Sequence, residues 1–180
     1  MRFAMFYKVQ GNDLHYQVIG EGTPVLLLHG LTCSSDLMIG CMEPIFERKP
    51  GYQRIYVDLP GMGGSSGNLE VASSNAILDI LLSFIDAELA GKAFLLVGES
   101  YGGYLARGIL AEKVSQVLGL MLICPLIKLN PADRILPQKS LVVGDLSIDK
   151  EDKVEEFFQI AVKQTAHTYQ RFEKEVVAGK

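Results

Sequence analysis

The chain has 180 residues, and its 17 Lys and Arg residues against 21 Asp and Glu residues give a formal net charge of −4 at pH 7. This mild acidity argues against nucleic acids and anionic membranes as partners, because both attract basic proteins. The hydrophobic fraction of 48% and the charged fraction of 21% are ordinary for a globular domain, so they exclude disorder, collagen-like repeats and coiled coil.

Signals for membrane insertion, secretion and disulfide bonding are weak. No apolar run reaches the roughly 18 residues that a membrane span needs, so we expect no membrane partner. The N-terminal stretch carries a charge at Arg2 and is too short for a secretory signal. Three cysteines, Cys33, Cys41 and Cys124, are too few for a disulfide framework, which favours a reduced, cytoplasmic chain.

The N-terminal part predicts a β-hairpin followed by a buried strand. Residues 6–10 and 14–19 are β-rich runs on either side of the turn residues Gly11, Asn12 and Asp13. Residues 25–30 are continuously apolar up to His29, which is typical of a strand buried on both faces of a parallel sheet.

The pattern then alternates between strands and helices. Similar apolar runs recur at residues 54–58, 93–98 and 117–124. Between them, residues 75–89 have apolar side chains at helical spacing, with Ser73 or Ser74 as N-cap and Gly91 at the end. A second helix is expected directly after residues 98–103. Buried strands alternating with helices predict an α/β fold, with a largely parallel sheet and flanking helices.

The character of the chain changes after Pro125. Residues 128–133 read as a loop, and from Val154 to Val176 the apolar residues follow one helical stripe. This stripe predicts a single amphipathic helix of roughly six turns. We therefore expect a sheet domain over residues 1–125 and a helical segment over residues 126–180.

The most informative motif is Gly98-Glu99-Ser100-Tyr101-Gly102, a G-x-S-x-G between a buried strand and a helix. A sharp strand-to-helix turn lifts the serine hydroxyl above the sheet and requires small residues two positions to either side. The amide that follows the serine lies at a helix N-terminus, which favours developing negative charge. The motif therefore predicts a nucleophilic serine.

Two further loops follow predicted strands. His29-Gly30 ends the first buried strand, where the second donor of an oxyanion hole usually lies, although an ordinary turn has the same sequence. Residues 58–67, Asp-Leu-Pro-Gly-Met-Gly-Gly-Ser-Ser-Gly, permit close backbone approach at the sheet edge. They lack the Lys of a P-loop, so phosphate binding is not expected.

Together these segments resemble the α/β-hydrolase fold family, over roughly residues 5 to 125. The sequence around Ser100 is similar to that of proline-iminopeptidase-like and esterase-like members, which implies an ester or amide of a small molecule as substrate. The resemblance implies Ser100 as nucleophile and the amides of Leu31 and Tyr101 as the oxyanion hole. A serine at this turn argues against the dehalogenase and epoxide-hydrolase branches, which use an aspartate there.

A serine nucleophile needs a base and an orienting acid, which in this family follow the serine. Only His167 lies after Ser100, so a compact triad would use His167 with Asp145 or Asp149. The helical stripe places His167 on the solvent face, which argues against that triad. The alternative that we favour makes residues 126–180 the start of a helical lid, with the acid and base absent from this truncated chain.

Other candidates are weaker. Cys33 and Cys41 have no paired His or Cys nearby, so no metal site is expected, and no motif indicates a cofactor. Glu99 is open to two interpretations, a group that meets a substrate amine or an exposed residue of the turn. A different class of function also stays open, a non-catalytic module that binds a small ligand or a partner, including a homodimer formed through the lid or an open sheet edge.

Overall fold

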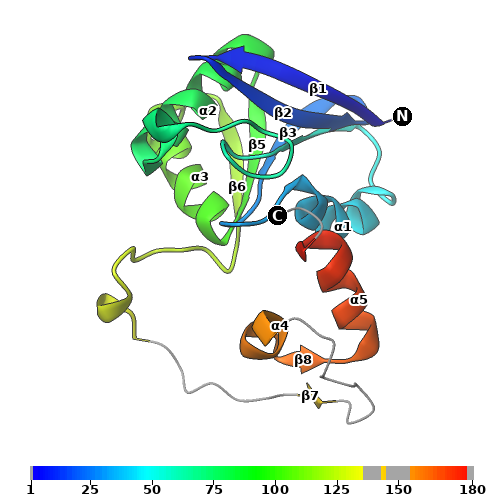
Figure 1. Ribbon diagram of the computed structural model, residues 1–180. Helices are drawn as coiled ribbons and strands as arrows, with labels where there is room; N and C mark the ends of the chain where they lie inside the picture. The colour runs from blue at the N-terminus through cyan, green and yellow to red at the C-terminus, as the bar shows by residue number, and fades with distance from the viewer. Residues whose placement is uncertain (1, 136–142, 145–154, 178–180) are drawn as a thin grey trace.

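The computed structural model describes residues 2–135, 143–144 and 155–177. It contains a mixed sheet with helices on both faces, followed by a small helical part (Figure 1). The sheet strands are β1 Arg2–Val9, β2 Asn12–Ile19, β3 Thr23–Leu28, β4 Tyr52–Val57, β5 Phe94–Glu99 and β6 Val117–Ile123. The helices are α1 Ser35–Phe46, α2 Ser74–Glu88, α3 Ser100–Glu112, α4 Glu155–Ile160 and α5 Ala166–Glu175. Two short strands, β7 Val143–Gly144 and β8 Lys163–Gln164, pair beside α4 and α5.

The strand order in the sheet is β1-β2-β4-β3-β5-β6. β3 pairs in parallel with β4 and β5, and β5 with β6, whereas the β1–β2 hairpin joins β4 in antiparallel register. This confirms the predicted α/β fold. The hairpin turn is tighter than the sequence suggested, because Gln10 and Gly11 alone form it with positive φ.

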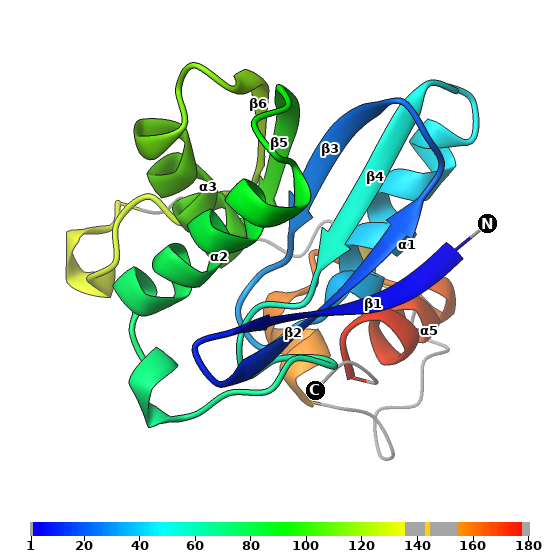
Figure 2. The ribbon, with the colours of Figure 1, turned by 90° about the horizontal axis from the view of Figure 1, so that it is seen from above.

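Helices lie on both faces of the sheet, as the view from above shows (Figure 2), and a hydrophobic layer packs on each face. α2 and α3 cover one face, where Leu26, Phe84 and Ile109 are fully buried. α1 covers the other face, where Met38 packs with the central strand residue Leu27. β3 contributes to both layers, which explains its uninterrupted apolar sequence. The central strands are therefore rigid supports for whatever lies at their carboxyl ends.

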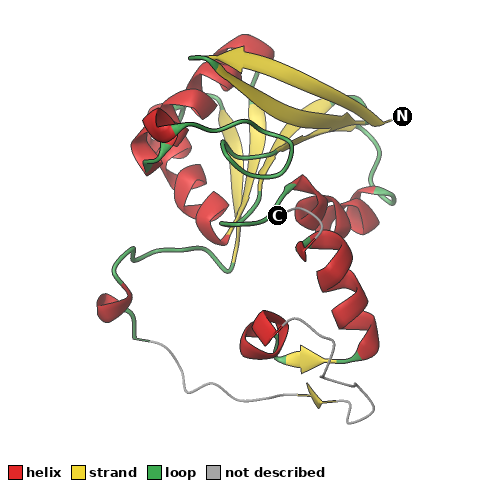
Figure 3. Ribbon diagram, viewed as in Figure 1, coloured by secondary structure: helices red, strands yellow, loops and turns green. Residues whose placement is uncertain are grey.

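The C-terminal part differs from the single long helix that the sequence predicted, and that prediction is wrong. The chain forms two helices, α4 and α5, separated by β8 (Figure 3). Thr165 caps the second helix by exchanging hydrogen bonds with Thr168 in a capping box. This cap starts the second helix at Ala166, after the break that follows Ile160.

Three buried aromatic side chains hold α4 and α5 together: Phe157, Tyr169 and Phe172. The two helices lie beyond the end of the sheet at which β6 ends, and α5 leans on α1 (Figure 1). Arg171 donates a hydrogen bond to the Gly40 carbonyl at 3.0 Å. We use the name C-terminal segment for residues 155–177. The predicted division at residue 126 stays a prediction.

Candidate active site

Ser100 lies on the turn at which β5 becomes α3. β5 ends at Glu99 and α3 begins at Ser100, so no loop residue separates strand from helix. The backbone of Ser100 has a φ of 49°, in the left-handed region that a residue with a Cβ rarely adopts. Such strain costs about 1–3 kcal/mol and persists only where the surrounding structure imposes it. The turn has the strand–turn–helix context that a nucleophile elbow requires.

Glycines on both sides of the serine are sterically required. A Cβ on Gly98 would lie 2.5 Å from the carbonyl oxygen of Gly102. A Cβ on Gly102 would lie 2.4 Å from the carbonyl oxygen of Leu28. These distances are far below van der Waals contact, so the sequence argument for small residues at these two positions has a direct steric basis.

The loop that follows β3 touches the elbow. A Cβ on Gly30 would lie 3.2 Å from the Cβ of Ser100, so the two backbones are in close approach. The N–H of Cys33 donates to the Gly30 carbonyl at 3.3 Å, which closes a turn around Thr32, whose φ is 62°. Leu31 lies in this turn with an exposed side chain. Its backbone is thus carried by a loop that packs against Ser100.

Tyr101 is fixed at the start of α3 by its own side chain. Its hydroxyl donates to Ser74 Oγ at 3.0 Å, and its ring stacks on Tyr104. N–H groups in the first turn of a helix have no acceptor within that helix. The N–H of Tyr101 is such a group, beside the Ser100 hydroxyl, as the motif predicted.

His29 is a structural residue of the core. It is fully buried, its Nε2 accepts from the N–H of Leu59 at 2.9 Å, and its Nδ1 therefore donates to the Gly30 carbonyl at 2.7 Å. Burial lowers the pKa of His29, against smaller opposing effects of Gly30 and Asp58. The ring is neutral with both nitrogens committed, so it holds the loop after β3 and supplies no base to Ser100.

His15 forms a partly buried pair with Asp58, the residue that follows β4. His15 Nδ1 lies 2.7 Å from Asp58 Oδ2, and the same carboxylate accepts from the N–H groups of Ser35 and Gly64 at 2.6 and 2.8 Å. Burial by itself would raise the pKa of Asp58, but these donors hold it below its ordinary value. β3 separates β4 from β5, which puts about 10 Å between this pair and the elbow. The sequence named Asp58 only as part of a loop and missed its pairing with His15.

His167 is exposed on the first turn of α5, as the helical stripe predicted. That end of α5 points away from the sheet, whereas the other end approaches α1 (Figure 1). Asp145 and Asp149, the two acids considered for a compact triad, lie outside the described residues. Within the described ranges, which include all three histidines, no imidazole hydrogen-bonds to Ser100.

A pocket of about 470 Å³ opens beside Ser100. Apart from Ser100, its walls come from residues 124–135, which follow β6 and which we call the strap. The strap is tied to the elbow because the N–H of Leu126 donates to the Ser100 carbonyl at 2.9 Å. The sequence predicts the start of a lid here. It does not predict which residues line the pocket, because the lining depends on how the strap folds back.

Glu99, the residue before Ser100, is not an exposed residue of the turn, and that interpretation is wrong. Its Oε2 is buried without a hydrogen-bond partner in the described part of the chain, while Oε1 accepts from the Cys124 thiol at 3.5 Å. Burial raises the pKa of Glu99, and the Cys124 thiol and the Gly30 backbone oppose only part of that rise. A carboxyl with a raised pKa thus lies directly before the nucleophile in the chain.

Three general features complete the description of the site. Among the described residues, no group of three or more His, Cys, Asp or Glu side chains could hold a metal ion. In the same residues, no helix is long and apolar enough to cross a membrane. Cys33, Cys41 and Cys124 form no disulfide bond within the described residues.

Comparison with known proteins relates this geometry to curated relatives. The pimeloyl-[acyl-carrier protein] methyl ester esterase of Vibrio vulnificus CMCP6 is 32% identical over 153 residues, which cover 82% of this chain and 56% of the esterase. Monoacylglycerol lipase ABHD6 of Bos taurus is 29% identical over 108 residues, 59% of this chain and 31% of the lipase. The chain therefore spans between a third and about half of these two relatives.

Structure and family comparisons agree. The crystal structure of an alpha/beta superfamily hydrolase from Oenococcus oeni PSU-1 superposes with a TM-score of 0.84 and 31% identity. The superposition covers 97% of this chain and 65% of that hydrolase. A family model for the alpha/beta hydrolase fold matches residues 23–172, from the start of β3 into α5. The chain thus belongs to the α/β-hydrolase fold family.

Proposed function

We propose that the protein is a serine hydrolase that cleaves an ester or amide bond of a small molecule through an acyl-enzyme on Ser100. The observation that carries this proposal is the strained backbone of Ser100, held between two sterically required glycines and beside a pocket. Two relatives named above are an esterase and a lipase, both of which act on carboxylic esters, so we favour an ester over an amide.

In the proposed reaction, Ser100 Oγ attacks the acyl carbon and loses its proton to a general base. The N–H groups of Leu31 and Tyr101 donate to the oxyanion, and such donors are typically worth about 3 kcal/mol each. The bond to the leaving alcohol then breaks, and the alcohol leaves with the proton that the base returns. Water attacks the acyl-enzyme in the same way and releases the acid and free Ser100.

The proposal includes a statement about the base. His29 and His15 are committed to other partners and His167 is exposed, so the described arrangement offers Ser100 no imidazole. We infer that these 180 residues carry the nucleophile half of the site and that the acid and base come from outside the described arrangement. Loss of both removes several orders of magnitude in rate, so the chain by itself should react slowly.

A fluorophosphonate probe, read by intact mass, tests both parts. We expect slow formation of one adduct on the wild-type chain and none on Ser100→Ala, while Ser115→Ala, a matched change at an exposed serine, labels like wild type. His167→Ala should leave the rate unchanged. Rapid stoichiometric labelling that disappears in both Ser100→Ala and His167→Ala would establish the compact triad and contradict our statement about the base. Equal labelling of wild type and Ser100→Ala would remove the hydrolase proposal.

The open edge of the sheet favours a second candidate, a non-catalytic binding module. β6 is the last strand of the sheet, and its side chains Leu118 and Met121 are 61% and 46% exposed. An exposed apolar edge strand can pair with another chain, including a second copy of this protein. A concentration-dependent dimer in sedimentation, with ligand-induced melting shifts that persist in Ser100→Ala, would favour this function over hydrolysis. A monomer without such shifts would exclude it.

A further inference from the structure

The pocket beside Ser100 is positively charged. Two of its lining residues, Lys128 and Arg134, are cations, and none is acidic. The rest of the lining on the strap is mostly apolar: Pro125, Leu126, Ile127 and Ile135. The pocket therefore combines a nucleophile, an apolar wall and two cations, which is an unusual surplus of charge for a chain with a net charge of −4.

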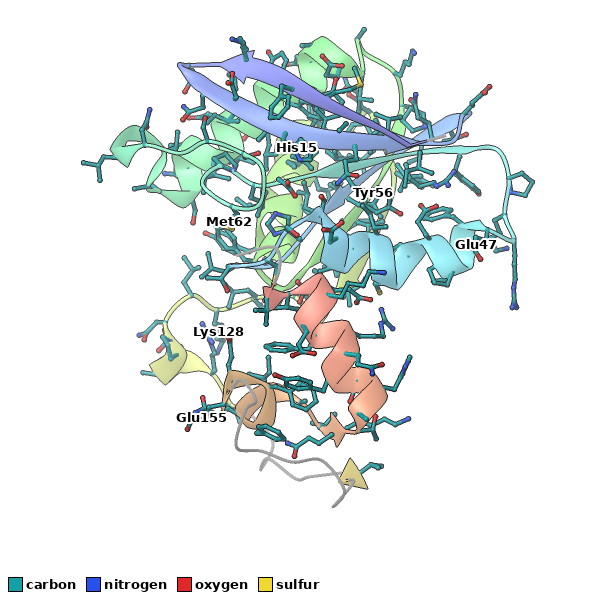
Figure 4. All side chains as sticks on the ribbon, turned by 45° about the vertical axis from the view of Figure 1, so that its right-hand side comes forward. His15, Glu47, Tyr56, Met62, Lys128 and Glu155 are labelled. Atoms are coloured by element: carbon teal, nitrogen blue, oxygen red, sulfur yellow. The ribbon has the colours of Figure 1, made fainter. Side chains whose placement is uncertain are left out.

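Both cations are held in place by the strap. Arg134 donates from Nε to the carbonyl of Lys128 at 2.8 Å and from Nη2 to the carbonyl of Leu129 at 2.9 Å. Lys128, which Figure 4 shows on the segment after β6, donates from Nζ to the backbone carbonyl of Asp133 at 2.8 Å. Strap and cations thus form one folded unit, in which Arg134 is partly buried and Lys128 is exposed.

Neither cation is neutralised within the described residues. The ion pairs in the described part of the chain include neither Lys128 nor Arg134. Asp133 contacts Lys128 through its backbone carbonyl and not through its carboxylate. Of the five N–H donors of a guanidinium, Arg134 uses two on its own strap, which leaves three for another acceptor. A planar pair of free donors matches the two oxygens of a carboxylate or a phosphate.

We propose that Lys128 and Arg134 bind an anionic group of the substrate, a carboxylate or a phosphate, while the apolar wall holds the alkyl part that links it to the bond attacked by Ser100. The inference rests on the proposed function insofar as it places the reacting bond at Ser100. It names the substrate class, an ester with an anionic group, and two residues that select it.

Equilibrium binding to the Ser100→Ala chain tests this without any turnover. Isothermal titration calorimetry would compare hexanoate with hexanamide, and hexyl phosphate with dimethyl hexyl phosphate. In each pair one ligand is anionic and the other is a neutral analogue. We expect at least one anion to bind about tenfold more tightly than its neutral partner, as a charge-assisted hydrogen bond would provide. The pair of ligands that shows the preference identifies whether the site binds a carboxylate or a phosphate. Added NaCl should weaken binding of the anion alone.

Variants separate charge from strap structure. The double variant Lys128→Gln and Arg134→Gln should bring the binding ratio close to one. Arg134→Lys, which keeps the charge but loses the planar pair of donors, should give an intermediate ratio. The matched control is Arg48→Gln with Lys49→Gln, an adjacent exposed pair after α1, which should leave the ratio unchanged. A ratio near one before any strap substitution, or an undiminished ratio in the double variant, would overturn the inference.

The two proposals fail independently. Equal fluorophosphonate labelling of wild type and Ser100→Ala removes the hydrolase proposal but leaves the anion preference measurable in the Ser100→Ala chain. Conversely, equal binding of charged and neutral ligands removes the anion site while Ser100 can still react with the probe. If Ser100 hydrolyses esters, the same preference should appear in kcat/KM for esters with a free ω-carboxylate over their methyl esters.

Discussion

The elbow and the C-terminal segment are held in place by very different amounts of packing. Ser100 follows β5, which lies between β3 and β6 in a sheet covered on both faces, and its glycine neighbours contact backbone atoms directly. The C-terminal segment has its own small cluster of three buried aromatic side chains and leans on α1 through Arg171. The position of Ser100, the proposed nucleophile, is thus fixed by many contacts, whereas the helices that follow the strap are held by few.

This difference teaches where function and adaptability reside. A nucleophile must keep its orientation to within fractions of an ångström, so it belongs on a rigid strand end. The C-terminal segment has a separate small core, so it can open locally at moderate cost. Each prediction below perturbs one side of this comparison and asks whether the effect stays there.

Gly102→Ala should have the largest effect. The added Cβ would lie 2.4 Å and 2.5 Å from the carbonyl oxygens of Leu28 and His29, and neither backbone can move without disturbing β3. We expect a loss of about 3 kcal/mol in the free energy of unfolding, measured by urea denaturation. Gly119→Ala is the control, because its Cβ would lie 3.3 Å from the end of the flexible Leu95 side chain. Equal losses for both variants would contradict the view that the elbow is the rigid part.

Phe172→Ala should act on the other region alone. Phe172 is buried between α4 and α5, and its removal leaves a cavity in a cluster too small to refill it. We expect protection of α5 amides in native-state hydrogen exchange to fall by about 2 kcal/mol, while protection of β3 and β5 is unchanged. Glu173→Ala, an exposed neighbour on the same helix, should alter neither. Loss of protection in β5 would show that the two regions form one cooperative unit.

The same contrast explains how much of the fold the sequence predicts. Continuous apolar runs locate β3, β4, β5 and β6 to within about two residues, because strands buried on both faces leave a strong signal. Helix α1 was not predicted, since Gly40 and Pro44 lower its helix propensity and its tertiary packing on the sheet overrides them. The prediction of a single C-terminal helix failed for a different reason. The apolar residues of α4 and α5 face one shared cluster, so the helical stripe in the sequence continues across the break between them.

At the site, the sequence located what is local and missed what is tertiary. Ser100, Leu31 and Tyr101 follow from motifs within one strand-to-loop junction each, and their catalytic roles stay predictions. The His15–Asp58 pair joins positions 43 apart, and Arg134 reaches the Ser100 pocket only because the strap folds back. Nothing in spacing or periodicity indicates such contacts, so the residues proposed to bind the anionic group could not be named from the sequence.

Glu99→Gln tests the buried carboxyl behind the nucleophile. Burial raises the pKa of Glu99 in the folded chain, so the folded state keeps its proton over a range above the unfolded value of 4.5. Folded wild type therefore has its full stability below about pH 4.5 and loses it as the pH rises through the folded pKa. The amide variant lacks this loss. The free energy of unfolding of Glu99→Gln minus that of wild type should therefore grow from about zero at pH 4.5 toward neutral pH, by at most about 1.4 kcal/mol per pH unit.

Urea denaturation of both chains at pH 4.5, 6.0 and 7.5 measures this difference, and Glu112→Gln, at the exposed end of α3, is the control. A constant difference between wild type and Glu99→Gln across this range would mean that Glu99 titrates normally. His29 adds an opposite dependence, because its lowered pKa favours the folded state above about pH 6.5. Comparison at each pH cancels that contribution, since both chains contain His29.

Ser100→Gly should have the smallest effect and the most specific meaning. Glycine adopts a φ of 49° without the Cβ penalty, so we expect Ser100→Gly to be more stable than Ser100→Ala by about 1 kcal/mol in urea denaturation. At Ser115, outside any helix or strand, the corresponding change to glycine should not stabilise the chain. An elbow that is less stable with glycine than with alanine would mean that the backbone is relaxed there. If glycine does stabilise the elbow, serine at position 100 lowers the stability of the fold relative to glycine. Such a cost in stability is expected of a residue whose hydroxyl takes part in function.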